Sequence, residues 1–228
     1  MSALLTTREL GQSHGTANVF SGVNVSINAG ERLSVLGASG SGKTTLLRLL
    51  AGLDTPRTGT IERASGLTIG MVFQDLALWP NLTALENVAL AVPSLPRAQQ
   101  RTAALAALES CRVADFAARR PGTLSIGQQQ RIALARSIAA RPDVLLLDEP
   151  FSSLDLVLKH ELVATVRTVI AERALVLVTH DPLEALALCD NALVLEAGRV
   201  IEHGPLHALL AQPRSELLQL FQAQLSRH

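Results

Sequence analysis

The chain has 228 residues, 48% of them hydrophobic, and its 20 lysines and arginines balance 20 aspartates and glutamates. A chain of this length buries roughly 70–75% of its unfolded surface, so it needs no disulfide or metal ion to fold. Zero net charge, together with the lack of a basic block with interleaved aromatic residues, counts against a nucleic-acid partner.

Cysteines and apolar segments narrow the class of protein further. Cys111 and Cys189 lie far apart and show no metal-ligand spacing, so we expect free thiols in a reducing cytosol and no structural zinc. The first ten residues lack the basic and apolar regions of a signal peptide. No apolar stretch reaches the ~18 residues of a membrane-spanning helix. We therefore expect a chain that does not itself cross a bilayer.

The predicted elements alternate between strands and helices. Residues 1–36 are expected to form short strands joined by glycine turns, with Val23, Val25 and Ile27 in a period-2 pattern. Further strands are expected at 68–73, 144–147, 174–179 and 192–196. Helices are expected at 44–52, 83–91, 97–118, from about 125 to before Pro142, at 155–173 and 182–189, and in the tail.

This alternation predicts an α/β fold with a parallel sheet. The unbroken apolar run at 144–147 is typical of a central strand covered on both faces. The mainly helical stretch from about 75 to 140 interrupts the alternation. We therefore expect one domain over residues 1–228, with a helical subdomain inserted at 75–140.

A glycine-rich segment follows the apolar run at 33–36 and precedes the helical stretch at 45–50. A strand, a glycine loop and a helix in this order form a phosphate-binding P-loop, although a chance glycine turn is the alternative. Glycines let successive backbone N–H groups face one anion, the lysine adds charge for the β- and γ-phosphates, and a threonine hydroxyl suits Mg²⁺. We predict that a nucleoside triphosphate is bound by Gly37, Ala38, Ser39, Gly40, Ser41, Gly42, Lys43, Thr44 and Thr45.

Two acidic residues end the buried strand at 144–147. A carboxylate at the tip of a strand beside a P-loop is placed to hold Mg²⁺, so Asp148 is the expected metal partner together with Thr44. Glu149, one residue later, is placed to polarise the water that attacks the γ-phosphate. The alternative is a solvated acidic turn.

The segment LSIGQQQR at 124–131 carries the most specific signal in the chain. It resembles the LSGGQ signature of the nucleotide-binding subunits of ABC transporters. The order and spacing of the other motifs over about residues 3–210 are also similar to that family. The resemblance implies the ABC ATPase fold, which has a P-loop NTPase core with a parallel sheet, an N-terminal antiparallel β-subdomain and an inserted helical subdomain.

The resemblance also implies a site shared between two protomers, with ATP and Mg²⁺ as cofactors. ATP would lie between two head-to-tail chains, with Lys43 of one and Ser125, Gly127 and Gln128 of the other facing the γ-phosphate. An ordinary helix cap at Ser125 is the alternative. A homodimer is sufficient because every site element is present in this chain, and pairing with a different ATPase remains open.

The same resemblance implies roles for three further residues. Gln74 matches the glutamine that contacts Mg²⁺ and the attacking water, and His180 matches the histidine that hydrogen-bonds the γ-phosphate. Asp155 matches the aspartate that couples the two sites across the dimer. Without the surrounding motifs, a lone histidine is more often structural.

The chain departs from the family pattern at three places. Ile126 replaces the first signature glycine, which we expect activity to survive. His14 stands where the family usually has an aromatic residue that stacks on adenine, with Phe20 as a more remote substitute. Only 30 residues separate Lys43 from Gln74, which suggests a shortened antiparallel subdomain.

The segment at 75–83 resembles the part of importer ATPases that lines a groove for a cytoplasmic coupling helix of the membrane subunit. Trp79, the single tryptophan, is a candidate anchor in that groove, and simple core packing is its alternative. The segment PFSSLD at 150–155 also resembles importer ATPases more than exporter ATPases. About 20 residues follow the last predicted strand and helix, which is too few for the regulatory β-domain of some importer ATPases.

The leading hypothesis is an ATPase subunit at the cytoplasmic face of the membrane that powers a separate permease, with a solute-binding protein as an optional partner. The alternative is a soluble ABC ATPase that acts in repair, translation or cluster assembly. Neutral charge and the lack of a coiled-coil insertion count against it. A non-hydrolysing assembly module is disfavoured because Lys43, Asp148, Glu149 and His180 are all present.

Overall fold

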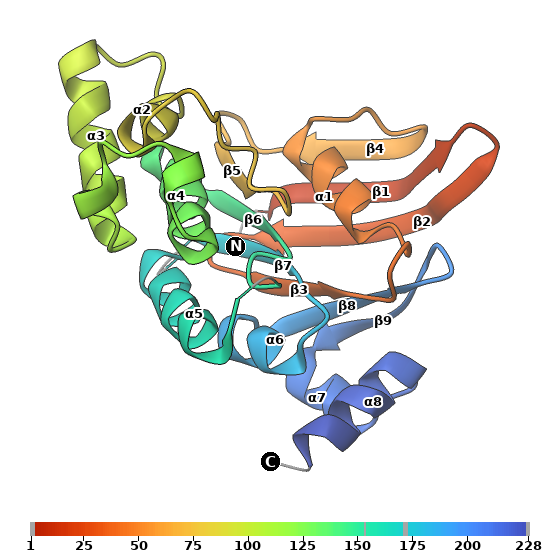
Figure 1. Ribbon diagram of the computed structural model, residues 1–228. Helices are drawn as coiled ribbons and strands as arrows, with labels where there is room; N and C mark the ends of the chain where they lie inside the picture. The colour runs from red at the N-terminus through yellow and green to blue at the C-terminus, as the bar shows by residue number, and fades with distance from the viewer. Residues whose placement is uncertain (1–2, 153, 171–172, 227–228) are drawn as a thin grey trace.

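The computed structural model describes residues 3–152, 154–170 and 173–226, and these form two sheets with flanking helices (Figure 1). The first sheet is antiparallel, in the order β2-β1-β4, with strands β1 Ala3–His14, β2 Ala17–Asn28 and β4 Thr58–Arg63. The second has the order β5-β6-β7-β3-β8-β9. Its strands are β3 Arg32–Leu36, β5 Ile69–Val72, β6 Val144–Asp148, β7 Ala174–Val178, β8 Asn191–Glu196 and β9 Arg199–Pro205. The predicted antiparallel subdomain and parallel core are thus confirmed.

The core consists of two layers on opposite faces of the parallel sheet. Helix α1 (Lys43–Ala51) lies between the two sheets, and its leucines pack with Val144 and Leu146 of β6. Leu145 and Leu147, which point to the other face, pack with helices α4 (Ile126–Ala139) and α5 (Leu156–Ile170). Alternate residues of one strand thus enter two cores, as expected for an unbroken apolar run.

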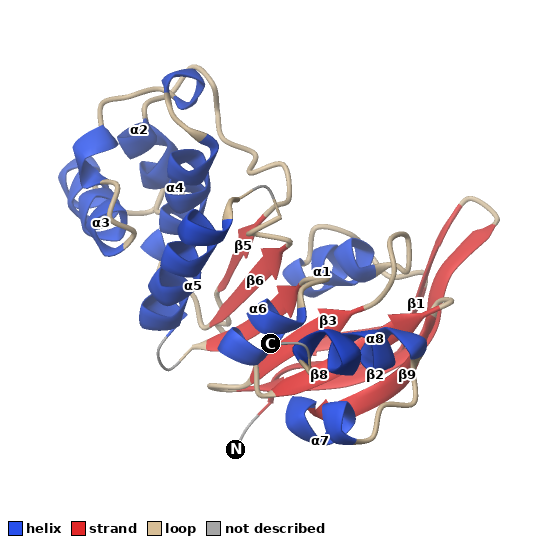
Figure 2. Cartoon of the chain, turned by 60° about the horizontal axis from the view of Figure 1, so that its bottom comes forward, coloured by secondary structure: helices blue, strands red, loops and turns tan. Residues whose placement is uncertain are grey.

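Helices α2 (Ala84–Ala89), α3 (Arg97–Ser110) and α4 pack together at one end of the molecule, away from the β1–β2 hairpin at the other (Figures 1 and 2). A capping box between Thr83 and Glu86 starts α2. Helices α6 (Pro182–Leu188), α7 (Leu206–Ala211) and α8 (Glu216–Leu225) lie nearer the β8–β9 side. None of the helices in the described ranges is long and apolar enough to span a bilayer.

The structure corrects several predicted boundaries. The helix expected over 97–118 ends at Ser110, because Arg112 adopts a left-handed backbone with φ of 58°. The helix expected over 155–173 is α5, and positions 171 and 172 lie outside the described residues. Strands β4 and β9, which pair antiparallel with β1 and β8 respectively, were not predicted. Their mostly exposed residues give no run of buried apolar side chains.

Candidate functional site

The P-loop turns sharply between β3 and α1. Gly40 and Gly42 have φ values of 77° and 100°, a backbone region that side chains rarely adopt. A Cβ atom on Gly42 would come within 2.9 Å of both the Val19 and Phe20 side chains. Both glycines are therefore favoured by backbone conformation, and Gly42 also by the close approach of β2. The loop delivers Lys43 to the first position of α1.

The Lys43 ammonium is held against its own loop. Its Nζ donates to the backbone oxygens of Gly37 (2.8 Å) and Ala38 (2.9 Å). Burial lowers the pKa of Lys43, while Glu149 and Asp148 act in the opposite direction. A buried cation at a helix N-terminus is well suited to bind an anion such as a phosphate.

Asp148, at the end of β6, accepts a hydrogen bond from the Thr44 hydroxyl at 3.1 Å. Burial raises the pKa of Asp148, the Thr44 hydrogen bond acts against it, and the neighbouring Glu149 raises it further. A cation beside these oxygens would relieve the cost of the buried carboxylate. A carboxylate and a hydroxyl are hard oxygen ligands, so the pair fits Mg²⁺.

Glu149 follows β6 in a left-handed conformation with φ of 45°. Its N–H donates to the Val178 oxygen at 3.0 Å, which ties it to the end of β7. Its Oε2 lies 3.5 Å from Nδ1 of His180, the residue two positions after β7. The ends of two neighbouring parallel strands thus bring a carboxylate and an imidazole together.

Lys43, Thr44 and Glu149 line one cavity of about 390 Å³. Asp148 and His180 do not line it themselves, but each contacts a residue that does, Thr44 and Glu149 respectively. Val19 of β2 is the residue that sequence reasoning missed, since it belongs to no motif and arrives through the β1–β2 hairpin. The cavity is lined by His14, Val19, Ser39, Gly40, Gly42, Lys43, Thr44, Thr45, Gln74 and Glu149.

Three predicted P-loop residues do not line this cavity. Gly37 and Ala38 line a separate cavity of about 170 Å³ with residues of β8 and α8. The Ser41 side chain is buried, and its hydroxyl has no hydrogen-bond partner among the described residues. Phe20, the remote substitute for an adenine-stacking residue, is fully buried in the core. It is therefore not available to a ligand, which leaves His14 as the ring at the cavity.

The signature residues do not reach this cavity. Ser125 caps α4 and forms a capping box with Gln128, in which each side chain bonds the other residue's backbone N–H. Gly127 is buried against Leu154 and Leu158, whereas Ile126 is 56% exposed. The start of α4 is therefore an ordered helix N-terminus that lies outside the chain's own cavity.

Asp155 and Trp79 also lie outside the cavity. The Asp155 carboxylate accepts from the Leu158 N–H at 2.9 Å at the start of α5. Trp79 is 61% exposed, so the alternative of core packing is wrong. Its backbone is fixed by the buried Asn87 side chain, which bonds both the N–H and the oxygen of Trp79.

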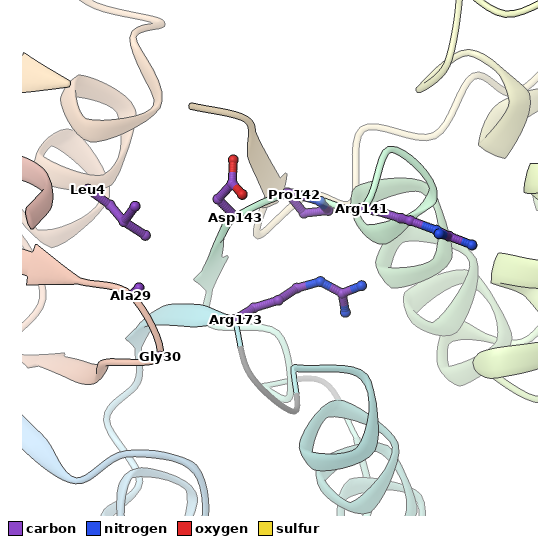
Figure 3. Close-up of a pocket in the computed structure, with 7 residues that line it drawn as sticks. All are labelled: Leu4, Ala29, Gly30, Arg141, Pro142, Asp143 and Arg173. Atoms are coloured by element: carbon purple, nitrogen blue, oxygen red, sulfur yellow. The ribbon is translucent and has the colours of Figure 1, made fainter. Parts of the chain in front are cut away.

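A further cavity of about 430 Å³ lies at the opposite end of the parallel strands (Figure 3). Gly30, Asp143 and Arg173, which line it, precede β3, β6 and β7. None of the predicted site residues lines this cavity. Open parallel sheets bind ligands beyond the carboxyl ends of their strands, so the cavity at the P-loop is the candidate site.

Comparison with known proteins agrees with this geometry. The family model described as ABC transporter matches residues 20–152. The Fe(3+) ions import ATP-binding protein FbpC 1 of Rhodococcus jostii is 39% identical over 227 residues, covering 93% of this chain and 65% of that protein. The spermidine/putrescine import ATP-binding protein PotA of Haemophilus ducreyi is 36% identical over 225 residues, with coverages of 93% and 61%. The chain thus spans less than two thirds of these relatives' lengths.

A solved structure supports the same assignment. The ATP-binding cassette MJ0796, in a dimeric post-hydrolysis state bound to ADP and Pi, is 30% identical with a TM-score of 0.78. The alignment covers 88% of this chain and 98% of that one. The matched family model includes the P-loop, the signature and both acidic residues, and the fold is that of an ATP-binding cassette. The chain belongs to the ABC transporter family.

Proposed function

We propose that this chain is the ATP-binding and hydrolysing subunit of a transporter and drives a separate membrane permease. The observation that carries the proposal is the convergence of Lys43, the Thr44–Asp148 pair and the Glu149–His180 pair on one cavity. We further propose that residues 1–228 act as one ABC ATPase domain, in which residues 75–140 form a helical subdomain.

The residues divide into three groups by their proposed roles. Nucleotide is bound by residues 37–45, with His14 against the base. Mg²⁺ is held by Thr44, Asp148 and Gln74, and when bound it neutralises charge on the phosphates. Glu149 accepts a proton from the attacking water, while His180 and Gln74 orient the γ-phosphate and that water. The 3.5 Å between Glu149 and His180 supports a shared role.

The proposal includes a second copy of the chain. Ser125, Gly127 and Gln128 would complete the partner's site, and Asp155 would couple the two sites. Two observations support this arrangement: the signature lies outside the chain's own cavity, and the solved cassette is dimeric. ATP binding then closes the dimer, and hydrolysis opens it.

Transport is favoured over other ABC functions by the relatives, which are named as import ATP-binding proteins. The exposed Trp79 lines a cavity of about 410 Å³ with residues of β5 and α4. We propose that this groove receives a helix of the permease at the cytoplasmic face of the membrane. A solute-binding protein is a further partner of an importer.

The first test is the mass of the Glu149→Gln protein in solution, with and without Mg-ATP. Loss of the base is expected to trap the ATP-bound state, so the mass should double only when Mg-ATP is present. ATP without added Mg²⁺, in the presence of a chelator, is the matched control for the metal. A protein that binds ATP but stays monomeric would contradict the proposed shared site.

The second test separates transport from a function away from the membrane. After cell lysis and sedimentation, the wild-type chain should accompany the membranes, and Trp79→Asp should move to the supernatant. Leu220→Asp, which places the same charge at an exposed leucine of α8, should stay with the membranes. Wild-type protein found only in the supernatant would favour the repair, translation or cluster-assembly alternative.

A further inference from the structure

We infer that Lys159 is a positioning residue that ties the start of α5, where Asp155 lies, to the loop that carries His180. The inference rests on the proposed function, because His180 is there assigned to the γ-phosphate. Lys159 does not line the nucleotide cavity. Its effect would therefore pass through the residues on either side of His180.

The ammonium of Lys159 joins two helices. It lies on the first turn of α5 and contacts two carboxylates of the α6 start, Asp181 Oδ2 at 2.9 Å and Glu184 Oε1 at 2.6 Å. Helices α5 and α6 lie side by side in both views of the chain (Figures 1 and 2). One cation thus fixes the first turn of one helix against that of its neighbour.

Thr179 and Asp181, the two neighbours of His180 in the sequence, belong to the hydrogen-bond network that includes Lys159 and Glu184. Asp181 caps α6 by accepting from the Leu183 N–H at 2.8 Å, and its own N–H donates to the Thr179 hydroxyl at 3.0 Å. That hydroxyl donates in turn to Glu184. His180 is therefore the exposed residue between two anchored ones, and its backbone position depends on contacts that end at Lys159.

The charges of the network are mutually stabilised. Glu184 is only 5% exposed, and a buried carboxylate is costly unless a cation and hydrogen-bond donors surround it. Burial acts to lower the pKa of Lys159, but the hydrogen bonds that it donates to Glu184 and Asp181, together with their negative charges, raise the pKa overall. Burial acts to raise the pKa of Asp181, but the contact with Lys159 and the backbone N–H groups of Leu183 and Glu184 together lower the pKa overall.

The other end of the link is Asp155. The Lys159 N–H donates to the Asp155 oxygen at 2.9 Å, and the Asp155 carboxylate accepts from the Leu158 N–H. Asp155 and Lys159 are thus joined within one helical turn. A partner chain that displaces Asp155 would displace the ammonium, and through it the loop at His180 beside Glu149.

The test compares steady-state ATP hydrolysis by the full-length wild type, Lys159→Met, Lys159→Arg and the double variant Lys159→Met/Glu184→Gln. The double variant removes the unpaired buried charge, so it keeps the fold while the link is broken. Its kcat should fall by about tenfold to a hundredfold, the scale of a misplaced catalytic group. Its KM for Mg-ATP should stay within about twofold, because the P-loop is unchanged.

Two variants serve as controls for this result. Lys159→Arg should retain most of the wild-type kcat, since it restores a cation to the two carboxylates. Arg167→Met removes an exposed cation from the same helix and should behave as wild type. A folded double variant with wild-type kcat would overturn the inference and leave Lys159 as a neutraliser of Glu184.

A second measurement does not depend on hydrolysis. The ring signals of His180, assigned by their loss in His180→Ala, should shift in the NMR spectrum of the double variant, whereas those of His203 and His207 should not. Unchanged His180 signals would overturn the inference. If the His180 signals shift in the double variant but the wild-type chain hydrolyses no ATP, the proposed function is wrong. The link between Lys159 and His180 would still hold.

Discussion

The P-loop end and the signature end of this molecule differ in how far each half of the site is organised within a single chain. At the P-loop, the ammonium of Lys43 and the hydroxyl of Thr44 are already bonded within the chain, and Asp148 and Glu149 are fixed by buried strands. At the signature, Ser125 bonds to Gln128 and Gln129 of its own helix, and Ile126 is exposed. One half of the site is organised by the core, whereas the other half is a helix N-terminus left for a second chain.

The largest expected effect tests the preorganised half. Glu149→Gln should slow ATP hydrolysis at least ~10²-fold, the scale for losing a positioned base. Affinity for ATP should be retained, because the amide still fits beside His180. Turnover is measured as phosphate release, and affinity with a fluorescent ATP analogue. Near-normal turnover would remove Glu149 from the mechanism.

The next largest effect tests the signature, the half of the site that is completed by a partner chain. In the Glu149→Gln background, Ser125→Arg should weaken the ATP-dependent dimer by about tenfold or more, since overpacking a close contact costs roughly 1–3 kcal/mol. Binding of ATP to the monomer should not change, because Ser125 lies outside that cavity. Ser125→Thr, which keeps a capping hydroxyl, is the control. A dimer of unchanged affinity, measured by ultracentrifugation, would place the signature away from the shared site.

A smaller effect separates binding from stability at the P-loop. Lys43→Met should lower the affinity for Mg-ATP by about tenfold or more, since a charge-assisted hydrogen bond contributes roughly 1.5–3 kcal/mol. The free energy of unfolding should not fall, because burial already disfavours the charged form of Lys43. Calorimetric titration and urea unfolding measure the two quantities. A marked loss of stability would show that Lys43 organises the loop rather than the ligand.

The smallest effect concerns the other exposed surface. Trp79→Ala should change the free energy of unfolding by no more than about 0.5 kcal/mol, because most of the ring is already in water. Asn87→Ala is the contrasting variant, since its buried amide bonds four backbone groups, and it should cost about 1–3 kcal/mol or more. Equal losses in the two variants, measured by urea unfolding, would mean that the tryptophan belongs to the core.

The sequence predicts contiguous features of this fold well. The P-loop, the two acidic residues at the end of the β6 segment and the cap at Ser125 all depend on neighbouring residues, so local patterns reveal them. The boundaries that were wrong depend on tertiary contacts. Buried Cys111 ends the packing of α3 before Arg112 turns away, and β9 is held by backbone pairing with β8 rather than by its own apolar side chains.

Within the candidate site, local sequence patterns also fail to reveal residues that reach the site from distant parts of the chain. Val19 lines the cavity only because the β1–β2 hairpin approaches the P-loop, and the burial of Phe20 cannot be read from its spacing. The contacts of Lys159 with Asp181 and Glu184 join two helices that are separated by a strand. Such long-range side-chain pairs need the packed structure before they can be recognised.

The burial of β6 has a consequence for the order in which the molecule opens. All five residues of this strand are buried, and it is paired on both edges, with β5 and with β7. Its amide protons should therefore exchange with solvent only through global unfolding, whereas exposed helix ends exchange through local fraying. Since Asp148 ends this strand and Glu149 follows it, the two carboxylates are attached to the part of the chain that opens last. The signature can thus move on the timescale of local fluctuations while the acids keep their place.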